Sequence, residues 1–181
     1  MNGLSSTTDD NIGAAELLVR EHLNLTARGD LAAAERNVTS DFFNHRSADE
    51  PIETRGRGPE VLRATIRWLH RAFTDMHFEF HEVLVVRDRA VARVTFHARR
   101  HDPFVVHDSP DGEMTNAFPS NGRSIAVSQT HWFRIAKGAI AEHDAVRDDL
   151  AMAKQLGWIP PKPIYILRML LAARRERRQK A

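Results

Sequence analysis

The second half of the chain alternates apolar and polar residues, as β-strands with one buried face do. Polar turns at 87–89 and 137–138 separate the alternating segments in pairs, which predicts two antiparallel hairpins. The segment 102–122 between the hairpins is rich in Pro, Gly, Asp and Asn, and we expect a functional lid or a disordered tip there. The predicted strands span residues 77–86, 90–101, 124–136 and 139–147.

The first half instead has apolar residues at helical spacing. Residues 1–10 are polar and are expected to be disordered, so that Asp10 or Asn11 would cap the first helix. Residues 46–58 carry proline, glycine and many charges and are expected to form a mobile loop. The predicted helices run from 11 to 28, from 30 to 38, from 59 to about 73, from 148 to 157, and from 163 into the arginine-rich end.

Helices followed by consecutive antiparallel strands predict an α+β fold, with the helices packed on one face of a curved sheet. A rigid connector with two prolines, 158–161, separates the domain at 1–160 from an extra amphipathic helix at 161–181. The expected order is therefore one domain followed by a basic C-terminal helix.

Two polar residues interrupt the apolar face of the strand at 124–136. Gln129 and His131 share that face with Ile125, Val127 and Phe133. Burying an amide or an imidazole without partners costs roughly 1–3 kcal/mol, so each needs a polar neighbour, a water molecule or a ligand. A hydrogen-bond network inside the core and a ligand pocket are both open at this point.

Composition excludes several classes of protein. The chain has no cysteine and hence no disulfide or thiolate metal site, and no apolar run is long enough to span a membrane. Residues 174–181 carry five positive charges and one negative charge, so the net charge of +2 leaves −2 for the rest. A nucleic-acid-binding domain is therefore not expected, and the absence of a secretory signal favours a cytoplasmic location.

Several short segments, in this order and spacing, resemble the SnoaL-like polyketide cyclases, also called ester cyclases. The resemblance covers roughly residues 17–160. It implies a cone-shaped fold like that of nuclear transport factor two, in which helices pack on the concave face of a curved antiparallel sheet around an apolar pocket, often in a homodimer. The matching segments are Gly58-Pro59, Ile66-Arg67-Trp68-Leu69, Ala72-Phe73-Thr74-Asp75, Gln129 to Ile135, Glu142-His143, and Arg147-Asp148-Asp149 to Gly157.

The resemblance also implies a reaction and a set of site residues. Cyclases of this family close a ring of a polyketide ester by intramolecular aldol chemistry, without a metal or an organic cofactor. Their pocket glutamine, histidine and asparagine fall on Gln129, His131 and Asn44. Trp68 and Phe133, which lie in the matched segments, are expected to contact the substrate.

The family's catalytic aspartate falls on Ala145 in this chain. Asp144 lies one residue earlier, and could replace it only if a bulge turned its side chain to the other face. Asp148 is better explained as a helix cap. His143 shares the face of Ala145 and has a side chain suited to proton transfer. The general base is thus His143, a re-aimed Asp144, or missing.

These observations leave three hypotheses. The chain is a cofactor-independent cyclase acting on an apolar, oxygenated small molecule, a non-catalytic protein that binds such a molecule, or a cofactor-free hydroxylase. No metal site is expected, because no carboxylate completes a ligand set with the histidines at 77, 81, 97, 101 and 107. The arginine cluster at 174–180 is typical of a solvated or disordered end. The alternative is an amphipathic helix that closes the pocket, joins a dimer or, less favoured, contacts anionic lipid.

Overall fold

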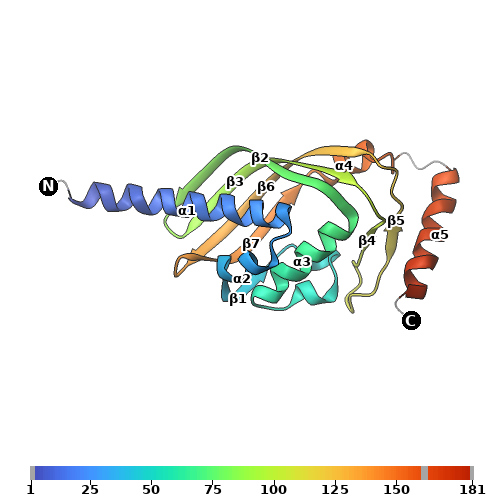
Figure 1. Ribbon diagram of the computed structural model, residues 1–181, viewed down its shortest axis with the longest axis horizontal. Coiled ribbons are helices and arrows are strands. Elements are labelled where there is room, and N and C mark those ends of the chain that lie inside the picture. The colour runs from blue at the N-terminus through green and yellow to red at the C-terminus, as the bar shows by residue number, and fades with distance from the viewer. Residues whose placement is uncertain (1–2, 160–162, 180–181) are drawn as a thin grey trace.

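The computed structural model describes residues 3–159 and 163–179, and a curved five-stranded sheet forms its centre (Figure 1). The strands lie in the order β1-β7-β6-β3-β2. Neighbours are antiparallel except β1, which runs parallel to β7, so the sheet is mixed rather than antiparallel as predicted. No hairpin joins β1 to β7, so no local turn dictates an antiparallel pairing. The strands are β1 (Val38–Asn44), β2 (Phe73–Val86), β3 (Arg89–Arg100), β6 (Ser124–Ala136) and β7 (Ala139–Arg147).

Helices α1 and α3 lie across the concave side of this sheet (Figure 1). Together with the sheet they enclose a core in which Val19, Leu25, Phe42 and Ile66 are fully buried. The predicted α+β class and the position of the helices are confirmed. The helices are α1 (Gly3–Arg28), α2 (Leu31–Asn37), α3 (Pro59–Ala72), α4 (Asp149–Gln155) and α5 (Pro163–Gln179).

Helix α1 begins earlier than the polar N-terminal sequence suggested. It starts at Gly3, so Asp10 and Asn11 lie inside the helix and do not cap it. Polar residues by themselves do not end a helix, and no proline occurs between residues 3 and 28 to interrupt its hydrogen bonds.

Two other helices begin where the sequence predicted. The Asp30 side chain accepts a hydrogen bond from Ala33 N at 2.9 Å, which caps α2, and Asp148 accepts one from Ala151 N at 2.8 Å, which caps α4. These bonds satisfy amide groups that have no partner inside the helix. Asp148 is therefore engaged as a helix cap.

The segment 46–58 has regular turns in the structure. It forms two short 3-10 helices, η1 (Ser47–Asp49) and η2 (Ile52–Arg55), and buries Glu50 and Thr54. A charged residue is almost never buried without partners, so Glu50 marks a specific environment. We call residues 46–58 the Glu50 loop.

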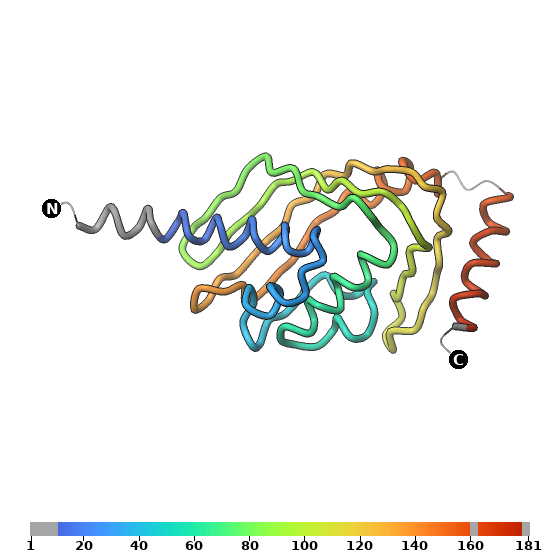
Figure 2. Tube along the Cα trace, viewed as in Figure 1, coloured from blue at the N-terminus to red at the C-terminus, as the bar shows by residue number. Residues whose placement is uncertain are grey.

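The long segment 102–122 contains a small two-stranded ribbon of β4 (Phe104–Val106) and β5 (Asn116–Phe118). Helix α5 packs beside β5, and Figure 2 shows it at the end of the molecule, far from the N-terminus. Arg71 of α3 and Glu176 of α5 form an ion pair that joins the end of α5 to the body. None of the helices over the described ranges is long and apolar enough to cross a membrane.

Gly58 fixes the start of α3 beside β1. Its backbone has φ of 92° and ψ of −177°, a conformation that is essentially restricted to glycine, and its N–H donates to Phe42 O at 2.8 Å. A Cβ atom at this position would lie 2.9 Å from Ser40 O, which belongs to the backbone and cannot move aside easily. Gly58 is thus required where α3 packs on the sheet.

We predict that Gly58→Ala lowers the free energy of unfolding by about 2–4 kcal/mol, since backbone strain and overpacking add. Gly122→Ala is the matched control, because Gly122 also has a positive φ (69°) but has open space around it. Gly122→Ala should lower the free energy of unfolding by about 1–2 kcal/mol. Urea denaturation of both variants measures the difference, and equal losses would contradict the contact with Ser40.

Candidate functional site

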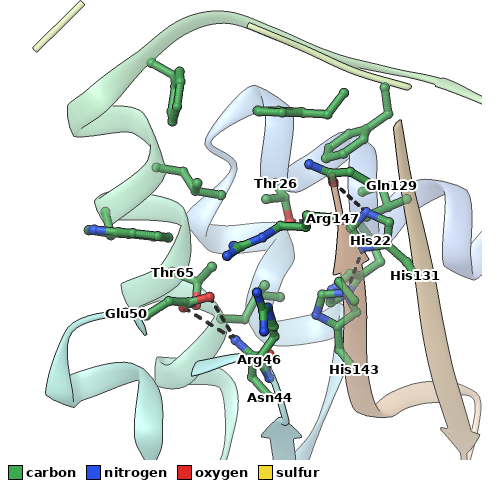
Figure 3. Close-up of a pocket in the computed structure, with 18 of the residues that line it drawn as sticks. His22, Thr26, Asn44, Arg46, Glu50, Thr65, Gln129, His131, His143 and Arg147 are labelled. Carbon is green, nitrogen blue, oxygen red and sulfur yellow. Dashed lines mark hydrogen bonds between the residues drawn. The ribbon is translucent and has the colours of Figure 1, made fainter. Parts of the chain in front are cut away.

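A largely apolar cavity lies between the concave face of the sheet and helices α1 and α3 (Figure 3). Such a surface suits an apolar ligand that is oriented by a few polar groups. The apolar part of the wall consists of Leu23, Phe42, Leu62, Trp68, Leu69, Phe73, Phe78, Phe96, Phe104, Ala145 and Met152.

The polar groups on the sheet side come from β6 and β7, and strand register brings them together. Gln129 pairs with Arg147, and His131 pairs with Ala145. Directly paired residues of antiparallel strands point to the same face, so all four face the cavity. Gln129 and His131 are 8% and 5% exposed, as expected from the strand alternation.

Gln129, His131 and His143 form a hydrogen-bonded chain in which each donor can be assigned. Gln129 Oε1 only accepts, so His131 Nε2, at 2.8 Å, must carry the proton and donate to it. A neutral His131 then accepts at Nδ1, which requires His143 Nε2, at 2.9 Å, to donate. Both ring nitrogens of His131 are therefore engaged, and the Gln129 amide nitrogen is the donor of this chain left for a ligand.

The histidines of the cavity are held in the neutral form by burial. Burial lowers the pKa of His131 to about 3 and that of His22 to about 4. Burial also lowers the pKa of His143 well below its usual value, and the neighbouring His131 adds to the effect. His22 Nδ1 lies 2.6 Å from Asn37 Oδ1 and donates to it. Imidazoles with so low a pKa are weak bases at neutral pH.

A buried carboxyl group, that of Glu50, lines the opposite side of the cavity (Figure 3). Thr65 Oγ1 of α3 donates to Glu50 Oε2 at 2.7 Å, and Asn44 Nδ2 of β1 lies 3.4 Å from Oε1. The residue is 4% exposed. The Glu50 loop therefore brings an acid into the pocket from outside the sheet.

The surroundings of Glu50 set it apart from the other carboxyl groups of the chain. Burial raises its pKa to about 7, although the Thr65 hydrogen bond and the Arg147 charge act in the opposite direction. A carboxyl group with a pKa near neutrality can both take and return a proton under physiological conditions. Glu50 thus has the properties of a general acid–base group.

Arg147 connects the Glu50 loop to the end of β7. Its Nη2 lies 2.6 Å from Asp49 Oδ2, and its Nε lies 3.3 Å from Asp149 Oδ1. Burial disfavours its charged form, but the two aspartates outweigh burial and raise its pKa. Arg46 also pairs with Asp149, at 3.2 Å. This charged cluster joins the loop to the start of α4 beside the cavity.

The structure brings most of the predicted site residues together. Gln129, His131, His143, Asn44 and Trp68 all line the cavity. The Trp68 indole is held by a hydrogen bond from its Nε1 to Val105 O at 2.8 Å. Their places on one surface follow from strand register and from the packing of α3.

Two predicted site residues lie elsewhere. Asp144 is exposed on the outer face of the sheet, because it pairs with Trp132 in regular register and no bulge re-aims it. Its carboxylate accepts a hydrogen bond from Ala145 N. Phe133 is buried in the core, where it stacks on His143 at 5.1 Å between ring centroids, and it does not line the cavity.

Sequence reasoning missed Glu50 and His22. Glu50 belongs to a segment so rich in charge and turn residues that it was predicted to be a mobile loop, and no periodicity marks it as buried. His22 gave only a weak signal in the sequence, namely its place beside Leu23 on the buried side of α1. Among the described residues, no group of histidine and acidic side chains could hold a metal ion.

Comparison with known proteins agrees with this architecture. The family model "SnoaL-like polyketide cyclase" matches residues 16–156. Because the match covers most of the chain, the protein belongs to the SnoaL-like polyketide cyclase family. A search of curated proteins gave no match.

Solved structures share the fold. TsrD from Streptomyces laurentii is 26% identical, with a TM-score of 0.64 over 80% of this chain and 96% of its own. A SnoaL-like polyketide cyclase from Agrobacterium tumefaciens is 17% identical, with a TM-score of 0.58 over 77% of this chain and 95% of its own. AclR from Streptomyces galilaeus, provisionally assigned as a hydroxylase, is 17% identical, with a TM-score of 0.60 over 82% and 99%.

The raised pKa of Glu50 predicts a pH-dependent effect of Glu50→Gln on stability. The folded state binds the Glu50 proton more tightly than the unfolded state, so this stabilisation is complete below pH 4.5 and is lost as pH rises through about 7. The free energy of unfolding of the variant, relative to that of wild type, should therefore rise by about 3 kcal/mol between pH 4 and pH 8. Urea denaturation across this range measures it. A difference that does not vary with pH would show that the carboxyl group titrates normally.

Proposed function

We propose that this protein is a cofactor-independent cyclase in which Glu50 replaces the aspartate that is missing at Ala145. The observation that carries the proposal is the buried Glu50 carboxyl group, which lines the same cavity as Gln129 and the histidines and has a pKa near neutrality. The apolar wall favours a largely apolar substrate, such as a polyketide, with carbonyl groups at two ends.

The chemistry follows from the two polar sides of the cavity. The Glu50 carboxylate removes a proton from a substrate carbon that lies beside a carbonyl group. The enolate oxygen that forms accepts a hydrogen bond from the Gln129 amide, the free donor of the histidine chain. The enolate carbon then attacks a second carbonyl carbon of the same molecule, a carbon–carbon bond forms, and the new alkoxide takes the proton back from Glu50.

In this proposal His131 and His143 orient Gln129 rather than transfer protons. Both nitrogens of His131 are occupied, and the low pKa of each ring disfavours proton uptake. Asn44 and Thr65 hold the Glu50 carboxyl group, and Trp68 contributes apolar wall. The predicted residues that line the cavity thus keep a place in the mechanism, and the base is Glu50, on another segment.

Glu50→Gln should lower the turnover of an aromatic polyketide ester by roughly 10²–10⁴-fold, since general acid–base catalysis is lost while shape is kept. Wild-type turnover should rise with pH up to about 7, because the base must be deprotonated. Glu53→Gln is the matched control, since Glu53 is exposed on the same loop. Product formation is followed by mass spectrometry over a panel of such esters.

A Glu50→Gln variant with full turnover would refute the role of this residue. Wild-type protein that binds the esters without converting them would favour the non-catalytic hypothesis instead. Oxygen consumption with an aromatic substrate would favour a hydroxylase.

We also propose that two copies of the chain pair through the outer face of the sheet. Leu84, Val91 and Trp132 lie in one row across β2, β3 and β6, and Leu84 and Trp132 are more than half exposed. Exposed apolar side chains in a row favour contact with another apolar surface.

Trp132→Glu should convert a dimer to a monomer in size-exclusion chromatography with light scattering, because it places a charge in the proposed contact. Leu17→Glu on α1 is the control and should remain dimeric, since Leu17 is also exposed but lies away from the sheet face. A monomeric wild-type protein would exclude the dimer.

A further inference from the structure

Arg55 lies where the Glu50 loop meets residues 107–110, which follow β4 and connect it to β5 in the ribbon. Its guanidinium group is surrounded by backbone carbonyl oxygens. On the ribbon side, Nη1 donates to Ser109 O at 2.7 Å and lies 3.2 Å from Pro110 O, while Nη2 reaches His107 O. On the loop side, Nη2 lies 3.0 Å from Ala48 O and 3.3 Å from Glu50 O. One side chain therefore contacts both segments.

The loop contacts of Arg55 include the backbone of the buried acid itself. Ala48 and Glu50 contribute the carbonyl groups, so Arg55 holds the backbone of Glu50 itself. A second bond crosses the same junction, because His107 N donates to Asp49 O at 3.1 Å. The backbone of residues 48–50 is thus fastened to the ribbon at three consecutive positions.

Arginine suits this position better than other residues. Its planar group carries five N–H donors in a rigid fork and remains charged when half-buried, so it can bind several carbonyl oxygens at once. Lysine has its donors on one nitrogen atom and cannot span the same set. The segment 102–122, which the sequence predicted to be a lid or a disordered tip, thus supplies acceptors for this arginine.

The carboxyl end of Glu50 is held by other groups. Thr65 of α3 and Asn44 of β1 bind its oxygen atoms, and Arg147 of β7 and Asp49 of the loop contribute charges. These partners act on the carboxyl group only if the loop backbone already lies against the cavity. Arg55 holds the loop backbone in this position, although its own side chain does not line the cavity.

We infer that Arg55 is a positioning residue for Glu50: by joining the Glu50 loop to the β4–β5 ribbon, it keeps the carboxyl group inside the cavity. The importance of Arg55 for catalysis rests on the proposed function of Glu50. Its effect on the position of the Glu50 carboxyl group can be tested without any substrate. In the absence of the junction, the loop moves outward and the carboxyl group enters water.

The test is the titration of Glu50 in the full chain by NMR, with ¹³C-labelled glutamate side chains and Glu50→Gln to assign the resonance. In wild type the carboxyl group should titrate near pH 7. In Arg55→Gln its pKa should fall toward the ordinary value of about 4.3, because it becomes solvated. Simple loss of a nearby positive charge would act in the opposite direction and raise the pKa.

Arg57→Gln is the matched control. Arg57 lies on the same loop and carries the same charge, but it is exposed and contacts residues of β1, namely Asp41 O at 3.4 Å and the Phe43 ring. Its removal should leave the pKa of Glu50 near 7. An equal fall in both variants would overturn the assignment to Arg55.

A folded Arg55→Gln protein in which Glu50 still titrates near pH 7 would also overturn the inference. If Arg55→Gln does not fold, Arg55→Lys is the second variant, since it keeps the charge but lacks the planar fork of donors. A lowered pKa of Glu50 in Arg55→Lys supports the inference, and an unchanged pKa overturns it. The outcome is independent of turnover. A low pKa in the variant together with an inactive wild type would support Arg55 and refute the cyclase proposal.

Discussion

The burial of one carboxyl group, that of Glu50, determines what the cavity can do. Inside an apolar wall the charged form is disfavoured, and its pKa rises to about 7 despite the Thr65 hydrogen bond and the Arg147 charge. The same burial tends to lower stability at alkaline pH, so the fold must hold the loop in place by other interactions. Those interactions come from Arg55 and from the Arg147–Asp49 ion pair.

On the opposite wall of the cavity, burial lowers the pKa of the histidines instead of raising it. His22, His131 and His143 are neutral because a charged imidazole is poorly solvated there. Neutrality fixes the donors along the chain from His143 to Gln129, and leaves the Gln129 amide facing the cavity as a donor. The cavity therefore has the titratable Glu50 carboxyl group on one side and the Gln129 amide on the other, and aromatic side chains form part of its wall.

Much of the fold and about half of the site could be predicted from local pattern. Alternation placed Gln129 and His131 inward, and helix caps at Asp30 and Asp148 were readable because they depend on neighbours three residues away. The family resemblance placed Ala145 at the pocket, and strand parity then put Asp144 on the opposite face. The pairing of His131 with Ala145 and of Trp132 with Asp144 leaves Asp144 outside. The parallel pairing of β1 could not be foreseen, since no turn connects it to β7.

By itself the sequence determined the order of helices and strands, the inward face of β6, and the absence of the family's aspartate at Ala145. Only the tertiary structure decided where the replacement carboxyl group lies. Glu50 sits in a segment without periodicity. Its burial depends on residues far away in the chain: Thr65 binds its carboxyl group, Arg147 pairs with Asp49 beside it, and the carbonyl groups of 107, 109 and 110 bind Arg55 of the same loop. Burial of a loop residue is a property of packing between distant segments, and local pattern does not record it.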